Sequence, residues 1–360
     1  MTFIDSLRNY LSPQILVILC LGFISGVPYG VLMDPLNYWL SEEGIEKSTI
    51  GLLSLVFLIY SLKVFWAPLV DRLKIPRLHR LGQRKSWLFL SQFVTGLIIL
   101  SISFVEPKES LNIFVYLILA IGFFSATQDI CADALRIELV EKRELGEASA
   151  VFVIGWRIGA ILLSGVATFY LAEFFGWNFA YQMIGIIVIF LSFIFLILIK
   201  EPTREIRPPK DFFKEPLGWF EDSFLAPLKD LYLRYKNHLL LLLLLIFTYR
   251  LSDMFLGPMA MPFYRETGFT KIEVAEITNF YGLIMTILGG LFAGASVYRF
   301  GLSKNLVAGA ILTPLTNLPF IYLNMIGHDV NFLIVTITLD NFTQGFVNVM
   351  GVTTVSYTHL

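Results

Sequence analysis

The sequence is poor in charged residues, since Asp, Glu, Lys and Arg together make up 15% of its 360 residues, against about 25% in soluble domains. Hydrophobic residues reach 56%, and the mean hydropathy is +0.71. A soluble domain of this size cannot bury so much apolar surface and still keep a polar exterior. The composition therefore excludes an ordinary soluble protein and predicts an all-α integral membrane protein.

Cysteine and histidine are also scarce, with two Cys and four His in the whole chain. Cys20 and Cys131 both fall inside apolar stretches, which predicts small buried side chains rather than a disulfide. The His residues lie at span ends or in connections, without the spacing of a metal site or a nucleophile and base. We therefore expect no metal and no other cofactor, and an intramembrane enzyme or sensor is the least favoured alternative.

Long apolar runs make up most of the chain, and about ten of them reach the length of roughly 20 residues that a membrane-spanning helix needs. The first follows Arg8, is too long for a signal peptide and has no evident cleavage site. The predicted spans are 14–40, 48–70, 86–105, 111–135, 148–172, 178–199, 238–262, 274–297, 303–325 and 331–355.

The positive charges are distributed unequally between the two sides of these spans. The connections on one side hold four Lys or Arg, namely Lys47, Lys108, Arg265 and Lys271, whereas the other side holds 20. Because Lys and Arg are retained on the cytoplasmic side, we expect a multi-pass protein with a cytoplasmic N-terminus. The lipid bilayer is its expected partner, and nothing in the sequence suggests binding to nucleic acid.

A long polar break divides the chain once. It predicts an N-terminal six-helix bundle over 1–200, a cytoplasmic linker over 201–237 and an incomplete C-terminal bundle over 238–360. Apolar residues recur in the linker at steps of three and four, which favours an amphipathic segment on the membrane surface. A solvated linker is the alternative.

The two bundles share a short pattern, because Glu-x-Gly-x-x-Lys occurs at 42–47 and again at 266–271. Six spans, a linker and a second set that echoes the first are the layout of a transporter built from parallel repeats. A second set of six would need two more spans, so we expect a fragment with its C-terminal end missing. The last residues, 356–360, resemble neither a span nor a loop.

Eight charged side chains inside the predicted spans are candidates for function. They are Asp34, Lys63, Asp129, Asp133, Arg157, Arg250, Asp253 and Asp340. A charge at this depth costs about 2.5–3.5 kcal/mol on insertion scales, so it is paired or faces a water-filled cavity. Several such charges in one chain predict a polar pathway through the membrane, and hence a transporter.

Two of the carboxylates, Asp129 and Asp133, are four residues apart and therefore lie on one helical face. Their mutual repulsion favours binding of a proton by one of them. The alternative is that each pairs with a cation, such as Arg136 or Arg157. Arg157 can itself hold an anionic substrate through paired hydrogen bonds, and Lys63 can either bind substrate or extend toward the cytoplasm.

The remaining charges inside the spans have few charged residues near them in the sequence. Arg250 and Asp253 are three residues apart, which favours an intrahelical ion pair slightly over a role in transport. Asp34 lies near the outer end of the first span, and Asp340 begins the polar segment 340–345.

Glycines recur at four-residue steps in three spans, a pattern typical of helices that approach each other closely. These glycines are Gly22, Gly26 and Gly30 in the first span, Gly155 and Gly159 in the fifth, and Gly290 and Gly294 in the eighth. Pro28, inside the first stripe, predicts a kink because it removes a backbone hydrogen bond.

The connection between the second and third spans contains Ala-Pro-Leu-Val-Asp-Arg at 67–72 and Gly-Gln-Arg-Lys at 82–85. This resembles the cytoplasmic loop of the major facilitator superfamily, in which such residues lock neighbouring helix ends in one state. The resemblance implies a gating role for Asp71, Arg72 and Arg84. The alternative is ordinary positive charge on the cytoplasmic side, which does not explain the Asp.

Four segments together resemble the muropeptide permease (AmpG) group of that superfamily. They are 21–28, 63–72, 126–134 and 155–159. The resemblance implies the major facilitator fold of two six-helix repeats in a bacterial inner membrane. It also implies import of anhydro-muropeptides for peptidoglycan recycling, driven by the proton gradient. The segment 126–134 is also similar to the acetyl-CoA transporter family, a relative, so another anionic solute such as a CoA thioester, a drug or a siderophore is the alternative cargo.

The implied ligands are small anions that carry carboxylates, sugar hydroxyls and peptide amides. The residues expected to bind them are Arg157, Lys63, Arg250 and Gln128. The residues expected to carry the coupling proton are Asp129 first, then Asp133, Asp253 and Asp340. We expect the protein to act as a monomer.

Overall fold

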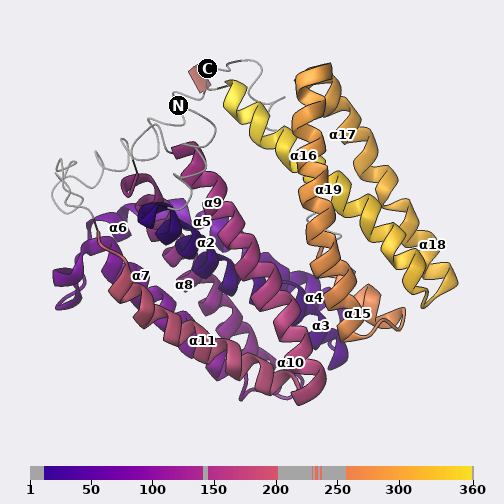
Figure 1. The fold of residues 1–360 in the computed structure, drawn as a ribbon. Coiled ribbons are helices and arrows are strands. Elements are labelled where there is room, and N and C mark those ends of the chain that lie inside the picture. Colours follow the sequence, from indigo (N-terminus) through magenta and orange to yellow (C-terminus); the bar gives the residue numbers. More distant parts are fainter. Residues whose placement is uncertain are drawn as a thin grey trace.

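The computed structural model describes residues 12–140, 145–201 and 257–358, together with 229, 232, 233 and 236. These residues are helical or lie in short connections, and none of them is in a β-strand. Figure 1 shows two groups of helices side by side. We call residues 12–201 the N-terminal part and residues 257–358 the C-terminal part.

The N-terminal part consists of a sequence of long helices interrupted by short helical turns. In chain order these are α2 (Pro13–Val31), α3 (Asp34–Glu42), α4 (Lys47–Leu53), η1 (Ser54–Phe57), α5 (Leu58–Leu62), η2 (Lys63–Phe65), α6 (Ala67–Arg72), η3 (Leu78–Leu81), α7 (Gln83–Ile102), α8 (Leu111–Glu138), α9 (Leu145–Arg157), η5 (Ile158–Ala167), α10 (Thr168–Phe175) and α11 (Trp177–Leu198).

The C-terminal part begins with a helix over 257–266. It continues with α15 (Lys271–Glu273), η8 (Val274–Tyr281), α16 (Gly282–Phe300), α17 (Leu302–Thr316), α18 (Leu318–Ile326) and α19 (Val330–Thr358). Both η5 and η8 are π-helical, and they contact each other between the two parts. Single π-helical turns are frequent at functional sites.

Eight helices within the described ranges are long and apolar enough to cross a membrane. They are Pro13–Glu42, Lys47–Phe65, Gln83–Ile102, Leu111–Glu138, Val151–Phe175, Trp177–Leu198, Lys271–Ala293 and Lys304–Ile326. Eight of the predicted spans are thereby confirmed. The predicted span 238–262 lies mostly outside the described residues, and 331–355 coincides with α19, which is not among the eight.

The first span is broken between α2 and α3, and the break does not lie at Pro28. Pro28 stays inside α2, whereas the chain leaves helical geometry at Met33, where ψ is -112°. Pro35 follows within two residues of the new helix start. A proline has no N–H to bond the carbonyl group four residues earlier, and its ring clashes with that group. Because the residue four before Pro35 is Val31, the last residue of α2, Pro35 accounts for the end of this helix.

The helix pair formed by α2 and α9–η5 is packed backbone against backbone. A Cβ atom at Gly22, Gly26 or Gly30 would overlap main-chain atoms of α9 or η5, and one at Gly155 or Gly159 would overlap the carbonyl groups of α2. The two predicted glycine stripes therefore lie against each other. In the C-terminal part, Gly289 and Gly345 make the equivalent backbone contact between α16 and α19. The predicted Gly290 also lies against α19, since a Cβ atom there would be 3.3 Å from a methyl group of Val349.

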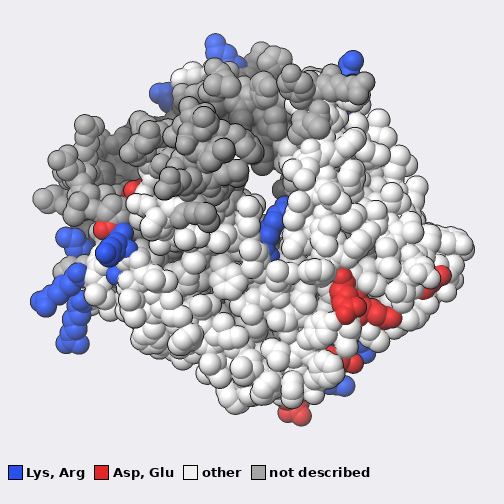
Figure 2. Space-filling view, in the orientation of Figure 1, with Lys and Arg blue, Asp and Glu red and all other residues white. Residues whose placement is uncertain are grey.

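Two ends of the bundle can be distinguished by their side chains. At one end, which we call the Glu42 end, the two parts are in contact, because α10 packs against α15 and Glu42 of α3 forms an ion pair with Lys271 of α15. The opposite end carries Arg84 at the start of α7, and we call it the Arg84 end. In the space-filling view, an opening separates the two parts above their contact, and Lys or Arg atoms lie on its wall (Figure 2).

Some predictions about the chain's organisation fall outside what the structure describes. The amphipathic segment expected within 201–237 lies almost entirely outside the described residues. The division into two bundles at this linker therefore stays a prediction. At the other end of the chain, Ser356 to Thr358 continue α19.

Candidate functional site

The first polar cluster within the membrane-spanning region joins η2 to α8. α8 is a continuous helix of 28 residues, so Asp129 and Asp133 stack one turn apart on the same face. Lys63 lies in the short turn η2, which packs against α8. Its amine forms an ion pair with Asp129 and lies 3.2 Å from Asp133 Oδ2. One cation thus bridges two carboxylates.

The structure corrects one interpretation of these residues. Asp129 forms its ion pair with Lys63 and not with Arg157. The reason is proximity, because the interrupted helix α5–η2–α6 lies directly against α8. Asp133 has the second cation that the sequence suggested, since Arg136 Nη2 lies 3.4 Å from Asp133 Oδ1.

The cluster is partly accessible. The side chains of Lys63 and Asp129 are 27% and 21% exposed. A cavity of about 410 Å³ lies against Lys63 and Asp133 and is also lined by Tyr60 and Asp71. A proton or a small polar group can therefore reach these carboxylates from the cavity, as a coupling site requires.

Arg157 is the last residue of α9 and immediately precedes the π-helical segment η5. Its side chain is partly buried. Within the described part of the chain, no acidic side chain is close enough to interact electrostatically with it. An unneutralised guanidinium in this position is suited to bind the carboxylate of a ligand.

Aromatic rings lie next to this arginine. Trp156, its neighbour in α9, has its ring 5.2 Å from that of Tyr29 in α2. The Tyr29 ring is also 4.7 Å from Phe57 and 5.1 Å from Tyr60. Tyr60 in turn donates a hydrogen bond of 2.8 Å to Ser125 Oγ on α8. This aromatic group extends from the Arg157 helix to the Lys63 helix.

Other predicted site residues have different surroundings. Gln128 is 0% exposed and donates a 2.9 Å hydrogen bond to the carbonyl oxygen of Ile24, so it joins α8 to α2 rather than lining a cavity. Asp340, in α19, accepts a 3.2 Å hydrogen bond from Gln344. Both Asp340 and Asp34 interact electrostatically with the buried Tyr264. Arg250 and Asp253 lie outside the described residues.

The predicted gating residues meet at the Arg84 end. Arg84 Nη2 lies 3.2 Å from Asp71 Oδ1, and Arg84 Nη1 lies 3.0 Å from Glu138 Oε1 at the end of α8. The Arg84 side chain is 7% exposed. The pairing of Asp71 with the later basic cluster was expected, although the role of Arg72 is open because its side chain is not described.

Two acidic residues of this cluster were missed by the sequence reasoning. Glu138 follows Arg136 by two residues, and its place at the end of the predicted fourth span was the available signal. Glu201 accepts hydrogen bonds of 3.2 and 3.0 Å from the backbone N–H groups of Arg84 and Lys85. It therefore caps the N-terminus of α7, where free N–H groups favour an anion.

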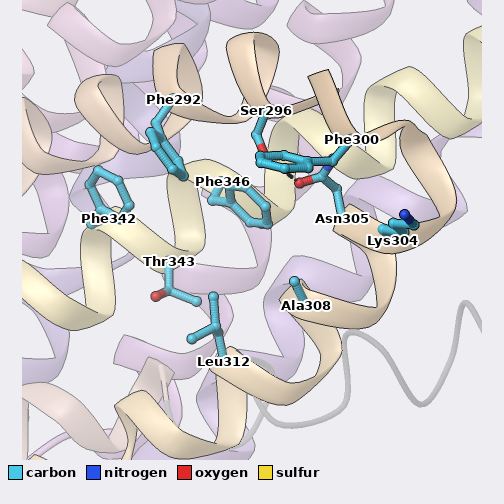
Figure 3. A pocket seen from close by; sticks show the side chains of 10 residues that line it. All are labelled: Phe292, Ser296, Phe300, Lys304, Asn305, Ala308, Leu312, Phe342, Thr343 and Phe346. Carbon is cyan, nitrogen blue, oxygen red and sulfur yellow. Dashed lines mark hydrogen bonds between the residues drawn. The ribbon is translucent and has the colours of Figure 1, made fainter. Parts of the chain in front are cut away.

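A separate groove lies in the C-terminal part, between α16, α17 and α19 (Figure 3). It has a volume of about 310 Å³, and its lining is largely apolar and includes the rings of Phe292, Phe342 and Phe346. At one side Ser296 donates a 2.5 Å hydrogen bond to Asn305. The groove contains none of the residues that the sequence predicted for the site.

The all-helical fold, the candidate spans and the charges held at depth around an opening define a multi-pass membrane transporter. The family model described as Major Facilitator Superfamily matches residues 16–358. The chain therefore belongs to the Major Facilitator Superfamily, as its loop motif and span pattern predicted.

Curated relatives narrow the position within this superfamily. The chain is 39% identical over 327 residues to a protein of Rickettsia conorii named putative transporter AmpG 4. The aligned region covers 90% of this chain and 77% of the relative. The chain is also 33% identical over 312 residues to the anhydromuropeptide permease of Escherichia coli K12. That aligned region covers 86% of this chain and 61% of the permease.

Solved structures agree on the fold. An auto-inhibited peptide transporter of the POT family has a TM-score of 0.65 at 14% identity, covering 95% of this chain and 82% of its own. A bacterial homologue of the human lysosomal transporter Spinster, in an inward-facing and unoccupied conformation, has a TM-score of 0.58 at 16% identity, covering 95% and 74%. The expected major facilitator fold is thus confirmed.

Proposed function

We propose that this transporter imports small anions of the muropeptide type together with protons across the cytoplasmic membrane of a bacterium. Two observations support the cargo: the name of the Escherichia coli relative, and the position of Arg157, which interacts with no acidic side chain among the residues that the structure describes. The excess of Lys and Arg in the connections at the Arg84 end supports a cytoplasmic location of that end and of the N-terminus. The protein acts as a monomer, and the proton gradient replaces any cofactor.

The difference between the two buried cations carries the proposal. Lys63 is neutralised by Asp129 and Asp133, whereas Arg157 interacts with no acidic side chain within the described residues. A charge without a partner is expensive at membrane depth, so an arginine in this state favours an anionic ligand. The neighbouring rings of Trp156 and Tyr29 suit the apolar faces of a sugar.

The bridged carboxylates supply the coupling step. When Asp129 takes up a proton, its ion pair with Lys63 is lost, and the amine retains only Asp133 as a partner. The Lys63 amine is then available for a second carboxylate of the substrate. Proton binding and substrate binding are thereby linked through one cation, as a symporter requires. Arg250, Asp253 and Asp340 stay candidates for additional contacts.

The test is uptake of labelled anhydro-muropeptide into vesicles that contain the full protein and carry an imposed proton gradient. Arg157→Ala should abolish uptake, because a charge-assisted hydrogen bond contributes about 1.5–3 kcal/mol. Arg80→Ala is the matched control, since Arg80 is exposed at the Arg84 end. A protonophore should stop uptake by the unmodified protein.

The outcomes separate the parts of the proposal. Arg157→Ala with normal uptake removes this residue from the site. Uptake that persists without a proton gradient contradicts proton coupling. Absence of muropeptide uptake by the unmodified protein, together with transport of a CoA thioester or another anion, contradicts the cargo but not the role of Arg157.

A further inference from the structure

The repeated pattern Glu-x-Gly-x-x-Lys has the same local geometry at both of its positions. In each case the Glu ends a helix: Glu42 is the last residue of α3, and the helix over 257–266 ends at Glu266. The glycine two residues later has a positive φ, +77° at Gly44 and +96° at Gly268, which reverses the chain. The Lys then begins the next helix, α4 or α15.

The charges of the two patterns are exchanged across the molecule. Lys47 Nζ lies 2.6 Å from Glu266 Oε2, and Lys271 Nζ lies 3.1 Å from Glu42 Oε2. Each repeat thus gives its lysine to the glutamate of the other repeat. Both ion pairs join the N-terminal part to the C-terminal part, at the Glu42 end.

The two ion pairs differ in their surroundings. Lys47 and Glu266 have side chains that are 57% and 50% exposed, so their pair lies at the rim. The Lys271 side chain is 14% exposed. Its amine lies 5.3 Å from the centre of the Trp177 ring and 3.9 Å from Glu173 Oε2. Lys271 therefore enters an acidic and aromatic site on the N-terminal part.

Further contacts fix the same interface. The Trp177 ring nitrogen donates a 2.5 Å hydrogen bond to Glu42, which orients that carboxylate toward Lys271. Tyr38 donates a 2.9 Å hydrogen bond to the carbonyl oxygen of Phe269, and Tyr170 donates one of 2.5 Å to Glu276. The ion pairs of Arg84, in contrast, join residues of the N-terminal part to each other.

We infer that the two Glu-x-Gly-x-x-Lys segments form a reciprocal latch that holds the Glu42 end closed in this conformation. Any motion that separates the two parts at this end must break both exchanged ion pairs and the Tyr38 hydrogen bond together. The latch therefore sets the equilibrium between the closed and open states of the Glu42 end. This inference goes beyond the proposed function, because it does not depend on which solute is carried.

The test measures the distance between the two parts at the Glu42 end. Spin labels are placed at Glu109→Cys and Met325→Cys, both exposed, in a background with Cys20→Ala and Cys131→Ala. Double electron–electron resonance on the full protein in lipid nanodiscs, without substrate, gives the populations of short and long distances. The measurement does not depend on transport activity. A negative result would therefore contradict the latch without contradicting the proposed cargo.

The decisive variants reverse the charges of the rim pair. Lys47→Glu and Glu266→Lys should each raise the ratio of open to closed states by about two- to fivefold, because an exposed pair contributes up to about 1 kcal/mol. The double variant exchanges the two charges and should return the ratio to within about twofold of the original. Lys271→Gln should have the largest effect, about tenfold or more, since it leaves Glu42 and Glu173 without their cation.

Lys108→Glu is the matched control, because Lys108 is an exposed lysine in the loop before α8. This loop lies at the same end of the bundle, where Glu106 accepts a hydrogen bond from Asn178 of α11. It should leave the distances unchanged. Lys47→Gln removes charge without reversing it and keeps the test available if a reversal prevents insertion. Distances in Lys47→Glu equal to those of the control, or a double variant no closer to the original protein than the single ones, overturn the inference.

Discussion

The Lys63 bridge gives the sharpest prediction about stability. Lys63→Met keeps the length of the side chain and removes the charge, which leaves Asp129 and Asp133 facing each other without their shared cation. Breaking a fully buried ion pair in this way costs about 3–5 kcal/mol, whereas an exposed pair contributes up to about 1 kcal/mol. The side chains of Lys63 and Asp129 are 27% and 21% exposed, so we expect an intermediate loss of about 1–3 kcal/mol.

The assay is thermal unfolding in detergent micelles, followed by tryptophan fluorescence. Lys63→Met should lower the melting temperature by several degrees. The double variant Lys63→Met with Asp129→Asn should recover most of the loss, because Asp133 retains Arg136 at 3.4 Å. A Lys63→Met protein as stable as the original, or a double variant less stable than both single ones, would refute the bridge.

The other predictions concern helix packing, coupling and the Arg84 end. Gly26→Val should lower the melting temperature markedly, because its Cβ atom would overlap the main chain at Trp156; an unchanged melting temperature contradicts this packing. Asp129→Asn should leave uptake insensitive to an imposed proton gradient, and a normal response to the gradient assigns the proton elsewhere. Arg84→Gln should destabilise the protein by about 1–3 kcal/mol, because Arg84 is 7% exposed and its ion pairs with Asp71 and Glu138 are lost; a denaturation curve equal to that of the original protein contradicts this stabilising role.

The sequence was sufficient for the architecture because membrane spans have a strong compositional pattern. A run of about 20 apolar residues has one favourable arrangement in lipid, a helix whose backbone bonds are satisfied internally. Eight of the predicted spans appear among the described helices for this reason. The break before α3 was not predicted, since the prediction concerned a kink at Pro28, which stays inside α2.

The partners of the buried charges were harder to predict. Depth along a helix can be counted from the sequence, but the direction of a side chain and the neighbour it meets depend on how helices are arranged. Arg136 and Arg157 were the cations considered for Asp129, and the interrupted helix α5–η2–α6 brings Lys63 there instead. Arg136, one of the two cations considered for this carboxylate pair, reaches Asp133 because the two lie three residues apart in one helix.

The latch was visible in the sequence only as a repeat. The pattern at 42–47 and 266–271 indicated two related halves, and the positive φ of its glycine explains why the spacing is kept. The exchange of partners requires the two parts to face each other at that end, which no local pattern encodes. When both copies of a sequence repeat contain an acidic and a basic residue, each copy can therefore supply the ion-pair partner of the other.

The most direct test of the central claim is a binding comparison between carboxylate and amide forms of the same anhydro-muropeptide. Purified protein should bind the carboxylate form at least about tenfold more tightly, as expected for charge-assisted hydrogen bonds of about 1.5–3 kcal/mol. In Arg157→Gln this preference should disappear, while affinity for the amide form stays the same. A preference that survives in Arg157→Gln, or that is absent from the original protein, would contradict the claim that Arg157 holds the anion.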